Sequence, residues 1–186
     1  MNETIESILN RRSIRKYEAK PVEQEKIDLI IECARFAPSA RNLQPWHFTV
    51  ITRRDVLDRI SEANRQIMLK SPVEMLRSFA QAPDYDSFRG APLAIIASGR
   101  KGADYAPCDC ANAVENMALA AYSLGLGSCY LGSFKICLEA PGGDIIQREL
   151  GIPEDYQPLY ALSVGYGSEI LGERQPRAEN TVALIG

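Results

Sequence analysis

The sequence predicts an α+β fold, a sandwich of helices around a mixed central sheet. Helical and strand-like segments follow one another without the regular βαβ alternation of parallel-sheet proteins. Residues 22–37 show helical periodicity, whereas residues 92–98 form a short apolar run typical of a strand covered on both faces. The chain of 186 residues can bury a substantial core and has no repeat or flexible linker, so a single domain spanning 1–186 is expected.

The first predicted helix occupies residues 22–37. Ile27, Ile30 and Ala34 recur there at helical spacing, charged residues fill the first turn, and Pro38 ends the segment. Apolar patterning identifies the next elements in the same way. They are a strand at 46–51, helices at 53–70 and 73–79, and the apolar strand at 92–98.

The second half of the chain is predicted to contain one long buried helix. Asp109 is placed to cap this helix, which has a wide apolar stripe and ends at Gly125 and Gly127. A strand at 128–131, a helix at 145–150 and a last core strand at 159–164 complete the order. The tail from about Gly167 is less regular.

Charge and hydropathy argue against several classes of protein. The formal charge of −3 and the pI near 5.3 give no general attraction for nucleic acid or anionic membranes. The longest uncharged run, between Glu115 and Lys135, is interrupted by glycines and serines, so it indicates a buried helix, a turn and a strand rather than a membrane span. The N-terminal residues lack the continuous apolar segment of a secretory signal, and a cytoplasmic location is expected.

The cysteines are expected to be reduced thiols. They are five in number and irregularly spaced, which disfavours a disulfide framework. Cys108 and Cys110 lack the two-residue spacer of common zinc knuckles, and His47 is the only histidine. No metal site is therefore predicted, with zinc as the weaker alternative.

The first segment with chemical character is Arg11-Arg12-Ser13-Ile14-Arg15-Lys16, which places four positive charges and a hydroxyl within six positions. Arginine presents a planar fork of donors that matches a phosphate, and the serine hydroxyl adds a hydrogen bond. This run therefore indicates a phosphate site. A solvated basic stretch is the alternative interpretation.

A second such segment runs from Pro38 to Trp46, with the sequence Pro-Ser-Ala-Arg-Asn-Leu-Gln-Pro-Trp. Its residues are mostly small or amide-bearing and are bracketed by prolines. Asn42 and Gln44 carry paired donors and acceptors suited to the edge of a heterocycle. A rigid connection between helix and strand would explain the same residues.

Taken together, the two segments resemble the opening signature of the nitroreductase family of flavoenzymes. Residues 109–132 are similar to the family's central helix and the strand after it, and residues 150–167 to its C-terminal strand region. The resemblance spans roughly residues 5–180. It implies an FMN-dependent oxidoreductase with a nitroreductase-like sandwich fold, built as a homodimer whose tail, from about residue 167, extends over the partner subunit.

The resemblance also implies two groups of FMN-binding residues on different chains. At the ribityl and phosphate groups it places Arg11, Arg12, Ser13 and Arg15, with Arg177 from the C-terminal region. From the partner subunit it brings Pro38, Ser39, Ala40, Asn42 and Gln44. The site would therefore require two chains. For Arg177, a solvated position in the tail is the alternative.

A third group is implied beside the isoalloxazine ring, at the strand end formed by Tyr130, Leu131, Gly132 and Ser133. The backbone N–H of Gly132 is expected to point at flavin N5, where a glycine allows close approach. Asn64 is placed at the pyrimidine edge, with an ordinary surface position as the alternative. The aromatic residues that either shape an acceptor pocket or belong to the core are Tyr105, Tyr130 and Phe134.

In this interpretation the flavin carries the chemistry, so no side chain is named as catalytic. NADH or NADPH is expected to reduce FMN, and flavin N5 to pass two electrons to a nitroaromatic, a quinone or an activated alkene. The chain lacks a four-cysteine ferredoxin run, so the electrons come from a separate donor. Gly125 and Gly127 follow a helix rather than open one, which disfavours a Rossmann fingerprint.

Two other functions stay open. One is a specialised reaction, such as flavin cleavage or dehalogenation, although the chain has no insertion of the kind expected to build a dedicated lid. The other is a flavin-binding homodimer with little turnover. The apolar segment Thr181–Ile185 favours a dimer as well, because such a segment could add to the sheet of a partner.

Overall fold

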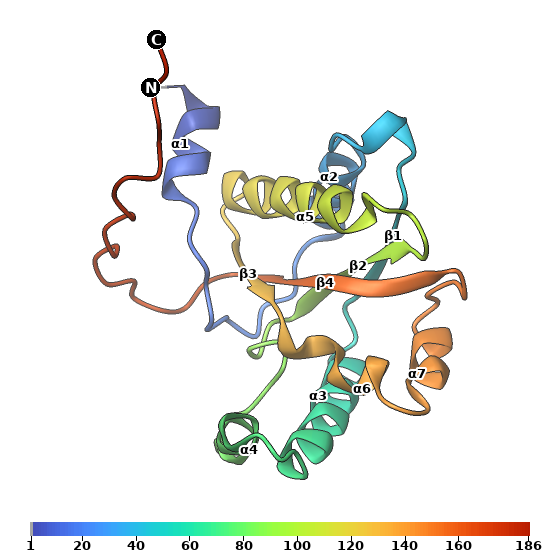
Figure 1. Ribbon diagram of the computed structural model, residues 1–186. Helices are drawn as coiled ribbons and strands as arrows, with labels where there is room; N and C mark the ends of the chain where they lie inside the picture. Colours follow the sequence, from blue (N-terminus) through green and yellow to red (C-terminus); the bar gives the residue numbers. More distant parts are fainter. Residues whose placement is uncertain (1) are drawn as a thin grey trace.

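The computed structural model describes residues 2–186, and its centre is a four-stranded sheet (Figure 1). The strands are β1 (Trp46–Ile51), β2 (Leu93–Arg100), β3 (Gly127–Leu131) and β4 (Tyr156–Gly165), in the spatial order β1-β2-β4-β3. The apolar run 92–98 thus lies in the middle of the sheet, where all of β2 except Arg100 is buried. The predicted α+β class is confirmed.

All strand pairs in the sheet are antiparallel, whereas a mixed sheet was expected. Among the described residues the only parallel pairing is an isolated bridge between Ser13 and Ser128, at the β3 edge. Apolar patterning tells which residues face the core but carries no information on strand direction. The expectation of a mixed sheet was therefore wrong for the four strands themselves.

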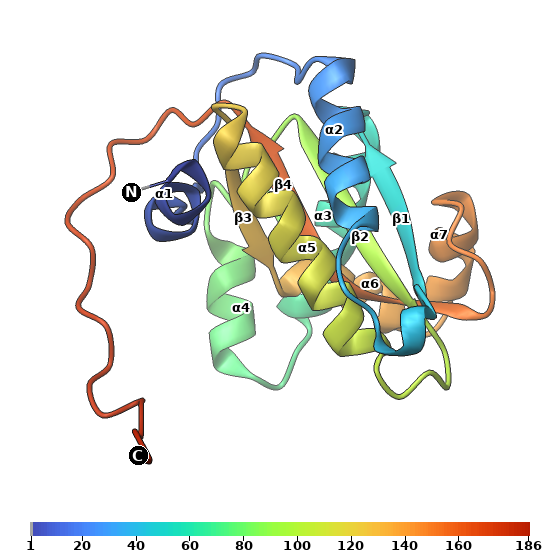
Figure 2. The ribbon, with the colours of Figure 1, turned by 90° about the horizontal axis from the view of Figure 1, so that it is seen from above.

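Helices cover both faces of the sheet (Figures 1 and 2). On one face lie α2 (Gln24–Arg35) and α5 (Ala106–Ser123); on the other lie α3 (Arg54–Leu69), α6 (Ile136–Glu139) and α7 (Gly143–Glu149), with α4 (Glu74–Gln81) packed on α3. The alternation along β2 builds both cores. Leu93 and Ile95 pack with α2 and α5, while Ala94 and Ile96 pack with α3 and α6.

Helix α1 (Glu3–Asn10) is the longest element that the sequence analysis missed. Asn2 caps it by accepting a hydrogen bond from Ile5 N at 3.0 Å. None of its residues is buried, and Ile5, Ile8 and Leu9 are exposed. These three residues nevertheless recur at helical spacing after the cap residue Asn2, so the sequence carried the signal for this short helix.

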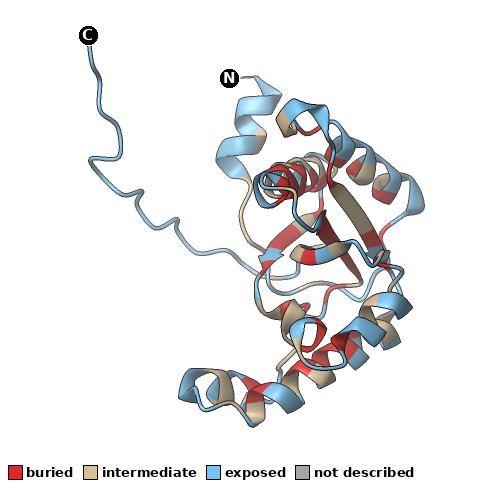
Figure 3. Cartoon of the chain, turned by 45° about the vertical axis from the view of Figure 1, so that its right-hand side comes forward, coloured by how far each residue is buried: buried red, intermediate tan, exposed pale blue. Residues whose placement is uncertain are grey.

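The chain beyond β4 runs along and then away from the body of the protein (Figure 3). It contains no helix or strand among the described residues, and everything from Leu171 onward is exposed. Val182, Leu184 and Ile185 keep 82%, 94% and 96% of their surface exposed. These three side chains form an exposed apolar surface on the tail.

The described residues contain no disulfide, and Cys110, Cys129 and Cys137 are buried. Burial raises the pKa of Cys110 to about 12 and that of Cys137 to about 11, so both stay protonated and unreactive. No group of three or more potential metal ligands occurs within residues 2–186. No helix in that range is long and apolar enough to cross a membrane.

His47 on β1 is predicted to make stability depend on pH. Its ring lies 5.8 Å from the ring of Tyr156, and its Nδ1 is buried with no hydrogen-bond partner in the described part of the chain. Burial lowers the pKa of His47 below its ordinary value of 6.5, so folding favours the neutral ring. The stabilisation is therefore complete above pH 6.5 and is lost as the pH falls towards the pKa of the folded state.

Urea unfolding of the wild type and of His47→Gln, at about pH 8 and about pH 5, measures this effect. We expect the free energy of unfolding to fall less between the two pH values in the variant, which cannot be protonated. Equal losses in both proteins would assign the pH dependence to other groups.

Candidate functional site

The N-terminal arginine run lies along the outer edge of β3. Ser13 pairs with Ser128, and Ile14 N donates a hydrogen bond to Ser128 O at 2.8 Å. This parallel pairing is a single isolated bridge, and Tyr17 then pairs with Gly167, beyond the end of β4. The positive charge of Arg15 opposes the rise that burial causes in the pKa of the Cys129 thiol.

Tyr17 holds this segment against the sheet. Its hydroxyl donates to Ile14 O at 2.6 Å and lies 2.9 Å from Ser163 Oγ on β4. Burial raises the pKa of Tyr17 well above its ordinary value, so the phenol stays protonated and can donate. The Ile14 carbonyl, and with it the backbone from Ser13 to Arg15, is therefore held against the sheet.

Replacing Tyr17 with Phe is expected to lower the free energy of unfolding by about 1–2 kcal/mol, because the hydroxyl is lost and its partners are left in a largely buried position. Urea unfolding measures the change. Tyr105→Phe is the matched control, since the Tyr105 ring is 61% exposed. If the two variants lost equal stability, the Tyr17 hydroxyl would not be what holds the segment.

Five arginines converge on one pocket of about 300 Å³ beside this run. Its lining residues are Arg11, Arg12, Ser13, Arg15, Arg174, Gln175 and Arg177. Contacts within the chain orient several of them: Arg11 Nε lies 3.1 Å from Glu115 Oε1, and Arg12 donates to Gly172 O at 2.6 Å. Arg174 donates to Arg11 O at 3.3 Å. Guanidinium groups so concentrated make the pocket strongly positive and present planar donors of the kind that match a phosphate.

Part of this pocket comes from tail residues that the sequence analysis did not name. Arg174 and Gln175 line it together with the predicted Arg177. Glu169 lines the neighbouring pocket, and its carboxylate accepts a hydrogen bond from Arg15 N. The cluster of charges from Glu173 to Arg177 was visible in the sequence, but the irregular tail gave no indication of where it folds.

The Pro38–Gln44 loop has a strained backbone. It contains the 3-10 helix η1 (Ala40–Asn42), and φ is 54° at Arg41, 53° at Asn42 and 48° at Gln44. Residues other than glycine rarely adopt this left-handed conformation, which costs on the order of 1 kcal/mol each. Strain concentrated in exposed residues is typical of functional loops.

Asp109 holds this loop in place rather than capping α5. The helix begins at Ala106, and the Asp109 carboxylate accepts a hydrogen bond from Ala40 N at 3.1 Å, so the predicted cap was wrong. Within the loop, Gln44 N donates to Ser39 Oγ at 3.1 Å and Gln44 Nε2 to Asn42 Oδ1 at 3.0 Å. The buried Asp109 carboxylate thus holds the backbone of the loop at Ala40.

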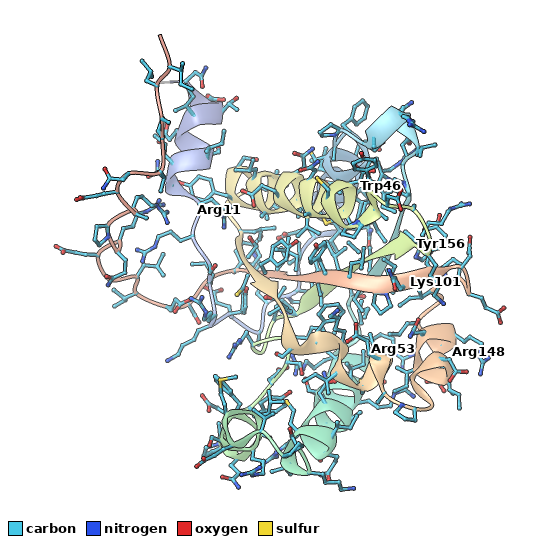
Figure 4. All side chains as sticks on the ribbon, viewed as in Figure 1. Arg11, Trp46, Arg53, Lys101, Arg148 and Tyr156 are labelled. Carbon is cyan, nitrogen blue, oxygen red and sulfur yellow. The ribbon has the colours of Figure 1, made fainter. Side chains whose placement is uncertain are left out.

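Within one chain, the loop and the arginine pocket lie towards opposite ends of α5. Ala40 contacts Asp109 in the first turn of the helix, whereas Arg11 and Arg12 share a second pocket with Tyr122 at its last turn. Figure 4 shows the same separation between Arg11 and Trp46, which follows the loop. The sequence-predicted site residues therefore do not form one cluster in a single chain.

The end of β3 presents a different kind of surface. Tyr130 is 42% exposed and packs edge to face on Tyr160, at 5.4 Å between ring centroids, whereas Leu131 is buried in the core. Gly132 is exposed, its φ of −100° is open to any residue, and an added Cβ would meet no atom within 4 Å. Neither the backbone nor the packing of this chain requires glycine here. Its bare backbone is available to a ligand.

Asn64 does not face a ligand site, which corrects its predicted contact with the pyrimidine edge. The residue lies in α3 and is completely buried. Its Nδ2 donates to Ser87 Oγ at 2.9 Å and to Phe134 O at 2.8 Å, and its Oδ1 accepts from Cys137 N at 2.7 Å. The amide is fully used inside the protein. Phe134 is buried as well and belongs to the core.

Comparison with known proteins decides the family. A model of the nitroreductase family matches residues 8–166. The chain belongs to the nitroreductase family. This confirms the resemblance seen in the sequence, and the matched region contains the arginine run, the Pro38–Gln44 loop and the end of β3. Arg174 and Arg177 lie beyond it.

Individual relatives match this nitroreductase over nearly its whole length. A Methanothermobacter thermautotrophicus protein, provisionally named NADH dehydrogenase/NAD(P)H nitroreductase, is 34% identical over 92% of this chain and 81% of its own. The FMN reductase (NADPH) of Bacillus subtilis is 26% identical over 94% of this chain and 70% of its own. The crystal structure of a Bacteroides fragilis nitroreductase with bound FMN is 29% identical, with a TM-score of 0.93 over the full length of both chains.

Proposed function

We propose that this nitroreductase is an FMN-dependent oxidoreductase, which passes two electrons from NADH or NADPH to a small electron-poor acceptor. The acceptor classes that we propose are nitroaromatics, quinones and activated alkenes. The arginine pocket at the edge of β3 carries the proposal, because five guanidinium groups and a serine hydroxyl suit the phosphate of FMN. The FMN bound to the Bacteroides fragilis structure and the name of the Bacillus subtilis relative support it.

The residues of the chain divide the work of binding and orientation. Arg11, Arg12, Ser13 and Arg15, which line one pocket, would hold the phosphate and ribityl groups through charge-assisted hydrogen bonds. The exposed backbone of Gly132 would contact the flavin edge that includes N5, and Tyr130 would form a wall of the acceptor pocket. Bound FMN supplies the hydride transfer, so no side chain acts as nucleophile or base.

A titration tests this function directly. Purified protein is expected to show the visible spectrum of an oxidised flavin, which anaerobic NADH or NADPH should bleach and a quinone or nitroaromatic should restore. Protein that is yellow but is not reduced by either nicotinamide would instead be the flavin-binding homodimer of low turnover. Loss of flavin, or release of halide from a halogenated aromatic, during aerobic incubation of the reduced protein would indicate a specialised reaction.

We also propose that the protein is a homodimer, in which the Pro38–Gln44 loop completes the partner's flavin site and the tail extends over the partner. Three observations support this. The loop lies away from its own arginine pocket, α1 exposes its apolar side chains, and the tail exposes Val182, Leu184 and Ile185. The strand β1 is an edge of the sheet, to which the apolar tail segment could add.

Deleting residues 181–186 is expected to raise the dimer dissociation constant at least about tenfold, a change of about 1.4 kcal/mol. The deletion removes the three large apolar side chains of Val182, Leu184 and Ile185, and burial of each contributes about 1.5–3 kcal/mol. Analytical ultracentrifugation measures the equilibrium, with Glu179→Ala as the control in the same tail. Wild-type protein that is monomeric in dilute solution while holding FMN tightly would contradict the two-chain site.

A further inference from the structure

The buried amide of Asn64 joins three separate segments of the chain. From its place in the middle of α3 it donates to Ser87, in the loop before β2, and to Phe134 O, and it accepts from Cys137 N. Phe134 and Cys137 belong to the turn η2 (Ser133–Lys135) and to α6, which directly follow the end of β3. The Asn64 side chain thus connects α3 and the loop before β2 to the segment that follows Gly132.

The Ser87 end of this link is itself anchored. Ser87 Oγ lies 2.9 Å from Tyr85 OH, and Ser87 N donates to Ser61 Oγ at 3.0 Å. Ser61 in turn donates to Asp86 Oδ1 at 2.8 Å, and the other oxygen of Asp86 pairs with Arg54. The hydrogen bond from Asn64 to Ser87 therefore ends in a hydrogen-bonded network that is itself held in place.

Gly132 and Ser133 form a short bridge between two fixed points. On one side, Leu131 is paired with Ala161 in the sheet and is buried. On the other side, Phe134 is completely buried and its carbonyl is held by Asn64. Two residues between such anchors have little freedom, so the position of the second anchor sets where the exposed Gly132 backbone lies.

We infer that Asn64 is a positioning residue, which sets the placement of the Gly132 backbone against the flavin by fixing Phe134 O and Cys137 N. The effect on the flavin rests on the proposed function, whereas the placement of the Gly132 backbone rests only on the hydrogen bonds within the chain. Asparagine suits this place because the task needs two donors and one acceptor in one plane. Aspartate keeps the acceptor but loses both donors, and leucine loses all three.

Three variants separate positioning from stability. Asn64→Asp keeps an acceptor for Cys137 N but puts a carboxylate against Phe134 O, whereas Ser87→Ala removes one partner and leaves both bonds to the turn. Asn64→Leu removes every bond. All three are expected to lower the free energy of unfolding. Only the Asn64 variants should change the visible spectrum of bound FMN. Only they should also change the ratio of the affinities for reduced and oxidised FMN, by roughly tenfold, which corresponds to about 30 mV in midpoint potential.

A second readout needs no flavin. In the flavin-free protein, hydrogen exchange at residues 134–138 is expected to be at least about tenfold faster in Asn64→Asp than in Ser87→Ala, and Asn64→Leu should also release the Cys137 amide. Unchanged exchange in Asn64→Asp overturns the inference whether or not FMN binds. An unchanged spectrum and potential in Asn64→Asp overturns it too, since a purely structural role would affect stability alone. Failure of the wild type to bind FMN would refute only the proposed function.

Discussion

Replacing Arg11 and Arg15 together with alanine is expected to raise the dissociation constant of FMN by about two to four orders of magnitude. A charge-assisted hydrogen bond contributes about 1.5–3 kcal/mol, so two of them amount to about 3–6 kcal/mol, and about 1.4 kcal/mol corresponds to tenfold. Both residues line the pocket of five arginines. The Arg11 side chain is already oriented by Glu115, so little ordering remains to oppose binding.

Equilibrium dialysis with FMN at several salt concentrations measures this effect. Salt should weaken binding to the wild type more than binding to the double variant, because the lost contacts are electrostatic. Arg53→Ala/Arg148→Ala is the matched control. These two arginines pair with Asp55 and Asp144, and Figure 4 shows them on the side of the sheet opposite to Arg11. Unchanged affinity in the Arg11/Arg15 variant would show that the arginine run is not the phosphate site.

Replacing Phe134 with alanine is expected to lower the free energy of unfolding by about 3–5 kcal/mol, the usual cost of removing a buried aromatic ring. The ring is completely buried in the core between α3 and α6. The loss is large against a total stability of about 5–15 kcal/mol for a typical domain. FMN affinity should fall as well, because the turn after Gly132 loses its support.

Urea unfolding of Phe134→Ala, followed by circular dichroism, provides the measurement. Phe79→Ala serves as the control, since this ring on α4 is 54% exposed and its removal should change stability by no more than about 0.5 kcal/mol. A similar midpoint for the two variants would mean that the Phe134 site collapses around the missing ring or is not part of the cooperative core.

Where periodicity reports burial, the sequence predicted the fold well. Residues 22–37 contain α2, and 92–98 fall almost entirely within β2, because their apolar side chains face a core on fixed sides. Strand direction could not be predicted in this way, because it leaves no trace in the apolar pattern. The helix α1 was missed although Ile5, Ile8 and Leu9 have helical spacing; the pattern is short, and none of these side chains is buried in the chain.

The candidate site was predictable to the extent that its chemistry is local. The arginine run shows its charge in six consecutive residues, and it does line a basic pocket. Asn64 shows the limit of such reasoning. An amide in a helix looks the same whether it faces a ligand or, as here, saturates its hydrogen bonds with Ser87 and Phe134, which only tertiary structure can distinguish. Arg174 was missed because the irregular tail gives no indication of its path.

The separation of the arginine pocket and the Pro38–Gln44 loop along α5 also affects how two different mutant alleles would combine in one cell. Damage to one of them leaves the other intact in the same chain. In the proposed homodimer, a subunit without Arg11 and Arg15 and a subunit without the loop amides would assemble into a pair that still contains one complete site. Two inactive alleles expressed in the same cell would then restore activity to each other, whereas a site built from one chain would show no such complementation.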